Sequence, residues 1–283
     1  ADYLRPVDGM HQANEYTVIL GLLFAYSTNG TAIIEFDFTT GIEQEVEAFP
    51  SPQELWNRLR LYKGLDEALE NKLLVPYHVG DKTPRYYQQI AINRAVEAIL
   101  KGKRRVLLTL ATGTGKTVIA FQIAWKLWNG YWNTKGVAHR RPRVLFLADR
   151  SFLVDDPKDK TFAPFGDARY KIEHGKAVKS REIYFATYQA IAKDENRPGL
   201  YREYAPDFFD LIIVDEAHRG SARDDSNWRE ILDYFKASTQ LGMTATPLRE
   251  DNRDTYEYFG TPLYTYSLRQ GIQAGFLAPY QFP

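Results

Sequence analysis

The fold of this chain is decided by the stretch Val106-Leu107-Leu108-Thr109-Leu110-Ala111-Thr112-Gly113-Thr114-Gly115-Lys116-Thr117. Residues 106–110 form a short apolar run, which predicts a buried strand. Gly113 and Gly115 then allow backbone angles and a close approach that a Cβ would block. A glycine-rich loop between a strand and a helix aims successive backbone N–H groups at one point, and together with the helix N-terminus these groups bind phosphate. The stretch therefore predicts a phosphate-binding loop.

The polar side chains of this loop have expected roles toward a bound nucleoside triphosphate. Lys116 would reach the β- and γ-phosphates, and the Thr117 hydroxyl would ligate Mg²⁺. The loop departs from the pattern G-x-x-x-x-G-K-[ST], because Leu110 stands where the first glycine belongs. The alternative is a Gly- and Thr-rich turn without function, which the flanking strand and helix patterns disfavour. The candidate nucleotide-binding residues here are Thr112, Gly113, Thr114, Gly115, Lys116 and Thr117.

Two adjacent carboxylates end a second apolar run, in the stretch Leu211-Ile212-Ile213-Val214-Asp215-Glu216-Ala217-His218. A buried strand here would carry them to the carboxyl edge of the sheet, where open α/β sheets bind ligands. Asp215 would hold Mg²⁺ through its water shell, and Glu216 would orient and deprotonate an attacking water. A solvated strand end is the alternative, but the preceding apolar run disfavours it. Both motifs in one chain predict ATP hydrolysis, with ATP and Mg²⁺ as cofactors.

The bulk composition limits the remaining choices. The chain has 283 residues, 44% hydrophobic and 25% charged, and a formal net charge of zero, as in an ordinary globular protein. A broad basic surface is therefore not expected, and contact with nucleic acid would come from a local groove. The absence of cysteine excludes disulfides and thiolate metal sites and fits a reducing cytosol. Residues 18–26, the longest apolar stretch, are shorter than the ~20 residues of a membrane span.

The order of the predicted elements gives the fold class. From residue 85 onward, strand and helix patterns alternate, which predicts an α/β domain of the RecA type: a parallel sheet with helices on both faces. Upstream, a helix followed by strands around an Asn29-Gly30 turn indicates a separate α/β unit. Predicted strands are residues 24–26, 32–38, 45–49, 106–110, 144–148, 183–186, 211–214 and 240–243; predicted helices are 12–23, 85–101 and 117–128.

The linking segment begins with a clear helix start. In Ser51-Pro52-Gln53-Glu54, Ser51 can cap the helix, Pro52 suits its first position, and Glu54 completes a capping box. The polar stretch that follows, up to Thr83, reads as a helical connector. We therefore predict four parts: an N-terminal α/β unit at 1–50, the connector at 51–84, the RecA-like domain at 85–266, and the start of a further RecA-like domain at 267–283.

Several motifs resemble those of superfamily 2 helicases and translocases. Asp-Glu-Ala-His at 215–218 resembles their motif II, and Thr244-Ala245-Thr246 resembles motif III. The resemblance implies that His218, Thr244 and Thr246 couple the nucleotide state to nucleic-acid binding. Alone, Thr-Ala-Thr would be only a strand-to-turn transition before Pro247.

An upstream segment, Arg85-Tyr86-Tyr87-Gln88, resembles the Q motif of the same superfamily. This implies that Gln88 reads the adenine edge and that Arg85 or an adjacent Tyr packs on the base. Gln89 is the neighbouring alternative, and a polar helix start is the interpretation without function.

Two further strand ends resemble motifs that contact nucleic acid. Leu147-Ala148-Asp149-Arg150 resembles motif Ia, and Ala186-Thr187-Tyr188-Gln189 resembles motif Ib. Arg150 and Thr187 are therefore candidate phosphate contacts, since phosphates dominate sequence-independent binding. Ordinary surface strand ends are the alternative. The basic run at residues 139–143 is either a solvated loop or a further DNA contact.

The chain as a whole resembles the motor (restriction) subunit of type I restriction–modification enzymes. The likeness is carried by residues 85–118, by 146–155 and by Asp215-Glu216-Ala217-His218-Arg219-Gly220-Ser221. Residues 9–16 resemble the Gln-x-x-x-Tyr helix of that subunit's PD-(D/E)xK-type nuclease domain, with Gln12 and Tyr16 in the motif positions. One exposed and one buried helix position is the alternative for this pair.

This resemblance implies ATP-dependent translocation of double-stranded DNA coupled to endonucleolytic cleavage, in the cytoplasm of a bacterium or archaeon. Methylation (M) and specificity (S) subunits would be its partners. It further implies that the nuclease metal ligands precede Ala1 and that the arginine finger belongs to the second RecA-like domain. Glu70-Asn71-Lys72 fits a Glu-x-Lys pattern but lies in the polar connector. The alternatives are a repair or RNA helicase and a non-catalytic, ATP-regulated DNA-binding module.

Overall fold

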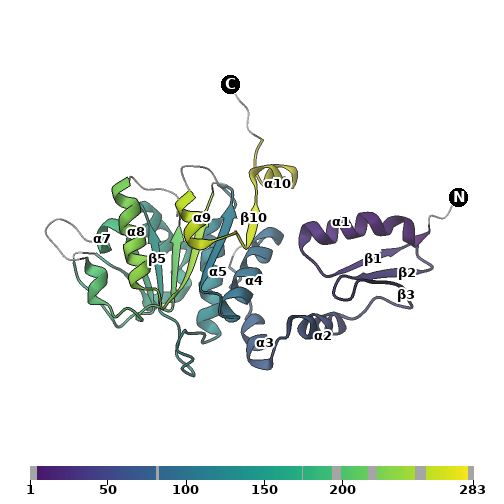
Figure 1. Cartoon of the computed structure of the whole chain (residues 1–283), viewed down its shortest axis with the longest axis horizontal. Coiled ribbons are helices and arrows are strands. Elements are labelled where there is room, and N and C mark those ends of the chain that lie inside the picture. Colours follow the sequence, from purple (N-terminus) through teal and green to yellow (C-terminus); the bar gives the residue numbers. More distant parts are fainter. Residues whose placement is uncertain are drawn as a thin grey trace. The chain divides into compact units, whose positions relative to one another are not determined.

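The chain divides into two compact units in a computed structural model: unit 1, Ala1–Glu70, and unit 2, Asn71–Pro283 (Figure 1). The structure describes residues 5–80, 83–173, 175–192, 199–215, 222–245 and 253–279. Within these ranges, no helix is both long and apolar enough to cross a membrane. The predicted boundaries after residues 50, 84 and 266 stay predictions.

Unit 1 is a helix followed by a three-stranded antiparallel sheet of order β1-β2-β3. The predicted helix starts earlier and ends earlier than expected, because Gly21 takes a left-handed conformation (φ 66°) that closes it. The third strand precedes its predicted position by three residues at each end. The elements are η1 (Pro6–Gly9), α1 (Met10–Leu20), β1 (Phe24–Thr28), β2 (Ile33–Asp37), β3 (Ile42–Val46) and α2 (Pro52–Lys63), with α3 (Glu67–Leu73) at the boundary.

Helix α2 begins as predicted. The Glu54 backbone N–H donates to Ser51 Oγ at 3.2 Å, and the Ser51 backbone N–H donates to the Glu54 carboxylate at 2.7 Å. Arg58 on this helix forms an ion pair of 2.6 Å with Glu35 of β2, whose side chain is fully buried. The Tyr26 hydroxyl of β1 donates to the same carboxylate. A charged cluster thus ties α2 to the sheet of unit 1.

Unit 2 is built on a seven-stranded, wholly parallel sheet of order β10-β4-β9-β8-β5-β7-β6. This confirms the predicted fold class. Its strands are β4 (Arg105–Leu110), β5 (Val144–Ala148), β6 (Arg169–Lys171), β7 (Ile183–Thr187), β8 (Leu211–Asp215), β9 (Thr239–Thr244) and β10 (Tyr264–Tyr266). Its helices are α4 (Tyr86–Leu100), α5 (Lys116–Asn129), α6 (Phe152–Asp156), α7 (Tyr188–Ile191), α8 (Ala222–Tyr234), α9 (Arg253–Phe259) and α10 (Leu268–Gln273), with short turns η2 (Pro157–Thr161), η3 (Ala163–Ala168) and η4 (Leu200–Glu203).

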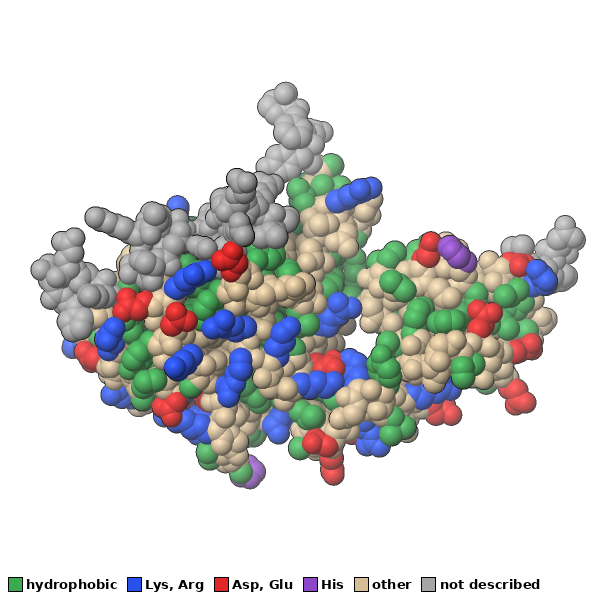
Figure 2. All heavy atoms as spheres, viewed as in Figure 1, with side chains coloured by type: hydrophobic (Ala, Val, Ile, Leu, Met, Phe, Trp, Pro, Cys, Tyr) green, Lys and Arg blue, Asp and Glu red, His purple; other side chains and the backbone are tan. Residues whose placement is uncertain are grey.

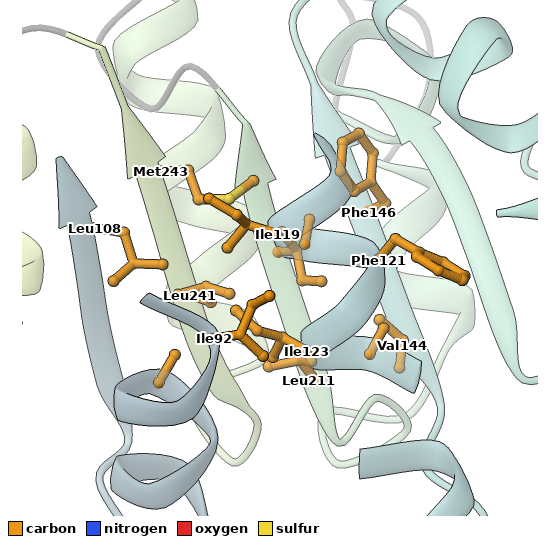
Figure 3. Packing of buried hydrophobic residues seen from close by; sticks show 14 of the residues in the cluster. Ile92, Leu108, Ile119, Phe121, Ile123, Val144, Phe146, Leu211, Leu241 and Met243 are labelled. Atoms are coloured by element: carbon orange, nitrogen blue, oxygen red, sulfur yellow. The ribbon is translucent and has the colours of Figure 1, made fainter. Parts of the chain in front are cut away.

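Two apolar clusters lie on opposite faces of this sheet, because successive strand side chains alternate between faces. One contains Leu108 and Phe146 together with residues of α4 and α5, and Figure 3 shows Ile119 and Ile123 of α5 packed against the strands. The other contains Leu107 and residues of α7, α8 and α9. Every residue of β5, β7, β8 and β9 is buried. Helices therefore cover both faces, as the continuous apolar strands predict.

Candidate nucleotide-binding site

The glycine loop lies between β4 and α5, as predicted. The Ala111 N–H donates to Tyr266 O at 3.0 Å, so the chain leaves the sheet beside β10. Gly113 (φ 84°) and Gly115 (φ 82°) both take left-handed conformations that side chains disfavour. Helix α5 begins at Lys116, and the first N–H groups of a helix have no partner within it. Loop and helix start together form a cradle for an anion.

The residues of the loop differ in their exposure to solvent. Thr112 and Gly113 are exposed, whereas Lys116 and Thr117 are half-buried in the first turn of α5. Thr114 is buried, and its hydroxyl donates to Ala111 O at 2.6 Å. The Thr114 hydroxyl therefore makes a hydrogen bond within the loop, and its predicted nucleotide contact stays a prediction.

Asp215 reaches the same edge of the sheet from β8. It is 4% exposed and is paired in register with Met243 of β9, and Thr109 of β4 is paired with Thr244. Only β9 separates β4 from β8, so the loop and the carboxylate are about two strand spacings, roughly 10 Å, apart. This is the arrangement predicted for a phosphate loop facing a Mg²⁺-binding carboxylate. Glu216, His218 and Thr246 lie outside the described residues.

The buried side chain of Tyr188 lies near enough to two carboxylates at this edge to feel their charge. Its side chain is buried, and burial first, then the charges of Asp215 and Asp149, raise the pKa of Tyr188 well above its ordinary value. Asp149 follows β5, the strand beside β8. A cation bound at the carboxyl edge would offset this concentration of negative charge.

The Q-motif residues lie at the start of α4, and Gln88 contacts the phosphate loop. The Gln88 side chain is 7% exposed; its Oε1 accepts from the Arg85 backbone N–H at 2.9 Å, and its Nε2 donates to Thr114 O at 2.8 Å. Each end of the amide thus makes one hydrogen bond within the chain. Gln89 is also engaged, donating to Pro84 O at 2.8 Å. The predicted contact of Gln88 with the adenine edge stays a prediction, and these hydrogen bonds link the Gln88 side chain to the phosphate loop.

Two aromatic residues that the sequence did not single out, Tyr266 and Phe276, pack beside the start of α4. The Tyr87 ring stacks on Tyr266 of β10 at 4.1 Å between centroids. The Arg85 guanidinium lies 4.8 Å from the centroid of Phe276, which also packs edge-on against Tyr87. Nothing in the local sequence near Tyr266 and Phe276 signals this contact, because it depends on the pairing of β10 with β4.

The two candidate DNA contacts lie on neighbouring strand ends. Ala148, two residues before Arg150, is paired in register with Thr187. The Arg150 side chain is 64% exposed and lies 3.6 Å from Asp149. Thr187 is nearly buried, and its hydroxyl accepts from Ala190 N–H at 3.2 Å, which caps α7. The Arg150 side chain is thus largely exposed, and the Thr187 hydroxyl makes one hydrogen bond within the chain; the phosphate contacts of both residues stay predictions.

The basic run at 139–143 is largely used within the chain. Arg140 forms a two-pronged contact with Asp210, at 2.7 and 2.9 Å, and the Arg143 backbone N–H donates to the same carboxylate. The Arg141 guanidinium lies 3.3 Å from the centroid of the Trp128 ring. Asp210 directly precedes β8, so this run lies at the amino edge of the sheet, opposite the phosphate loop. On the face shown in Figure 2, basic and acidic side chains are mixed, as the zero net charge suggests.

The nuclease-type motif lies on α1 of unit 1. Gln12 and Tyr16 are both exposed, and Gln12 Nε2 donates to the Tyr16 hydroxyl at 2.9 Å. The alternative interpretation, one exposed and one buried position, is therefore wrong. Among the described residues, no group of three or more His, Cys, Asp or Glu side chains could hold a metal ion.

The sheet order, the glycine loop after β4 and the carboxylate ending β8 define a RecA-like α/β domain. Residues 81–249 match the model of the family described as type III restriction enzyme, res subunit, and the chain belongs to this family.

Several of its relatives are type I restriction enzyme subunits. It is 46% identical over 281 residues to the EcoAI endonuclease subunit of Escherichia coli, covering 96% of this chain and 34% of that protein. It is 31% identical over 226 residues to the EcoKI endonuclease subunit of E. coli K12, covering 68% of this chain and 17% of that protein. A solved fragment assigned to an HsdR subunit of a type I restriction enzyme from Vibrio vulnificus YJ016 is 59% identical, with a TM-score of 0.83 over 98% of this chain and 48% of that one. The chain is thus homologous to type I endonuclease subunits and spans about a third of the EcoAI subunit.

Proposed function

We propose that this chain forms part of the ATP-driven motor of a type I restriction endonuclease. Such a motor would move double-stranded DNA past the complex and so bring about its cleavage. The observation that carries the proposal is the phosphate loop and Asp215 on strands separated only by β9, in a chain 46% identical to an EcoAI endonuclease subunit. The family match and the 46% identity support this proposal over a general repair or RNA helicase.

The residues present fit a bound nucleotide with Mg²⁺. Gly115 lies so close to α4 that a Cβ there would meet Gln88 Nε2 at 2.6 Å, so the loop path requires glycine. Lys116 and Thr117 would contact the β- and γ-phosphates and the metal from the first turn of α5. Asp215 would hold the metal's water shell from β8. Bound Mg²⁺ would neutralise charge developing on the phosphates.

The remaining roles rest on the resemblance alone. Glu216 would orient the attacking water and accept its proton. His218, Thr244 and Thr246 would pass the nucleotide state to the DNA contacts, which include Arg150 and Thr187. Double-stranded DNA and the M and S subunits of a type I complex would be the partners, in a bacterial or archaeal cytoplasm. Gln12 and Tyr16 would belong to the nuclease domain of the full subunit.

Replacing Lys116 by alanine in the full-length subunit tests the proposal. DNA-stimulated ATP hydrolysis by the complex with M and S subunits should fall by at least about 10²-fold, the scale for losing one preorganised charge contact. Lys101→Ala is the matched control, because Lys101 pairs with Glu97 at the far end of α4. Unchanged hydrolysis by Lys116→Ala would refute the motor reading. A wild-type complex that binds ATP but never hydrolyses it would favour the non-catalytic module instead.

A further inference from the structure

Residues 73–78, which we call the strap, carry the chain from the end of α3 to the rest of unit 2. The Gln122 side chain of α5 bonds to the strap as a neighbouring strand would. Its Nε2 donates to His78 O at 2.8 Å, and its Oε1 accepts from the His78 N–H at 3.0 Å. Gln122 is 3% exposed, so these bonds are shielded from water. The backbone of the strap is therefore fixed to α5 at His78.

A second side chain on the same face of α5 binds the other end of the strap. Lys126, four residues after Gln122, donates from Nζ to Leu73 O at 2.9 Å and also to Val75 O. Leu73 is the last residue of α3, and the final carbonyls of a helix have no partner within it. Lys126 is 4% exposed, and its Nζ lies 4.8 Å from the centroid of the Tyr77 ring. Burying a cation is costly unless its N–H groups are bonded, and here the strap carbonyls accept them.

The side chains of the strap add packing to these bonds. The His78 ring lies edge-on to Phe121 and Trp125 of α5, with centroids 5.5 and 4.8 Å apart. The Tyr77 hydroxyl donates to Asn93 Oδ1 of α4 at 2.7 Å. The strap is therefore attached to both α4 and α5, and we expect it to move with them.

Helix α5 joins the strap to the phosphate loop. The helix begins at Lys116, directly after Gly115, and runs to Asn129. At a rise of 1.5 Å per residue, Gln122 and Lys126 lie about 9 and 15 Å along its axis from Lys116. Rigid secondary elements can carry energetic coupling between distant sites. A displacement of the loop on nucleotide binding or release would therefore reach the strap through α5.

We propose that Gln122 and Lys126 are positioning residues that make the strap follow α5, and that they couple ATP hydrolysis in unit 2 to DNA cleavage by the nuclease domain to which unit 1 would belong. This inference rests on the function proposed above. Loss of either contact leaves the phosphate loop and its nucleotide in place but loosens the chain that leads toward unit 1. Hydrolysis and DNA translocation then continue, while cleavage falls.

The test uses the full-length subunit in complex with M and S subunits. Gln122→Met and Lys126→Met nearly keep the length of each side chain and remove its hydrogen bonds to the strap. We expect ATP hydrolysis, and displacement of a third strand bound to duplex DNA, to keep their wild-type rates. DNA breaks per ATP hydrolysed should fall about tenfold, which lies within the usual range of coupling between sites. Retained hydrolysis also shows that the domain is folded, because α5 carries the phosphate loop.

Gln53→Met and Lys101→Met are the matched controls, because they make the same two changes at exposed positions and should leave all three quantities unchanged. Amide hydrogen exchange reports on the strap itself. The His78 N–H, which is bonded to Gln122, should exchange faster in both strap variants. Exchange in β4 should keep its wild-type rate.

The outcomes separate this inference from the motor function. Normal cleavage per ATP in both strap variants, despite faster exchange at His78, would overturn the inference, and so would unchanged exchange at His78. A loss of hydrolysis in step with cleavage would also overturn it, because the strap would then support the phosphate loop itself. A wild-type complex that hydrolyses ATP without displacing the third strand would overturn the motor function and, with it, this coupling.

Discussion

Units 1 and 2 bury their sheets differently. In unit 2, β5, β7, β8 and β9 are buried along their whole length, between helices on both faces. In unit 1, four of the five residues of β3 are exposed, and the buried positions of β2 are Glu35 and Asp37. The buried apolar side chains in the described part of unit 1 are Met10, Ala25 and Leu65. Apolar packing thus stabilises the sheet of unit 2, whereas the sheet of unit 1 is stabilised in part by the charged cluster of Glu35, Arg58 and Tyr26.

The position of the buried carboxylate also differs. Glu35 lies in the middle of a strand and meets Arg58 of α2, whereas Asp210 lies just before β8 and meets Arg140. In unit 2 the strand interiors are therefore left to apolar residues, and polar groups occur at the strand ends. Asp210 organises the amino edge, and Asp215 serves the carboxyl edge, where the nucleotide is expected. The structural carboxylate, Asp210, and the expected metal-binding carboxylate, Asp215, thus lie at opposite ends of β8, and the site is positioned by a rigid strand.

The largest expected effect is on the core of unit 2. Phe146→Ala should lower its unfolding free energy by about 3–5 kcal/mol, because the ring is fully buried between α5 and the sheet. Phe36→Ala in unit 1 is the matched comparison; this ring is only half-buried and packs edge-on against Phe38. Hydrogen exchange measured on peptides from each unit would report the two losses separately. An equal or larger loss of unfolding free energy in unit 1 would contradict the proposed difference between the two units.

Next in size is the buried carboxylate at the amino edge. Burial acts to raise the pKa of Asp210, but bonds from Arg140, Arg143 and Thr134 outweigh it and hold that pKa below its ordinary value of 3.8. Asp210→Asn should cost unit 2 about 3 kcal/mol at neutral pH. The folded-state pKa lies below the unfolded one, so this stabilisation is present above about pH 4 and disappears as pH falls through the folded pKa.

The neighbouring surface pair gives the control for Asp210. Asp207 lies 2.7 Å from Lys135, and both side chains are about half exposed. Asp207→Asn should therefore cost less than about 1 kcal/mol. Urea unfolding of both variants between pH 3 and 7 checks this, and similar losses for the two would show that burial of Asp210 is unimportant.

A third effect, at most as large as that of Asp210→Asn, concerns a buried lysine of α5. Lys126 donates to the carbonyls of Leu73 and Val75, and burial lowers its pKa from 10.5 to about 8. Between these two values the folded state binds fewer protons than the unfolded state, so its stability rises with pH. Relative to Lys126→Met, the wild type should gain no more than about 3 kcal/mol between pH 8 and pH 10.5. Urea unfolding followed by tryptophan fluorescence measures this; a constant difference would show that Lys126 keeps its proton.

Strands such as β5 and β8 could be predicted because each is a continuous apolar run followed by a turn. The strands β6 and β10 could not: each has three residues, mostly tyrosine or basic, and owes its place to a neighbouring strand. The positions of the loop and of Asp215 could be predicted because each follows an apolar strand pattern and the loop needs glycine where its backbone is left-handed. The use of Gln88, the internal hydroxyl of Thr114 and the cap by Thr187 depend on partners brought close only by folding.

The central claim is that nucleotide hydrolysis at the β4 loop moves DNA. The direct measurement uses duplex DNA to which a third strand is bound at increasing distances from the recognition site of the complex. It records the time that a reconstituted full-length complex takes to displace this third strand. With ATP and Mg²⁺, the delay should grow in proportion to distance, and a complex carrying Lys116→Ala should displace nothing. Displacement by that variant, or a delay independent of distance, would contradict the account.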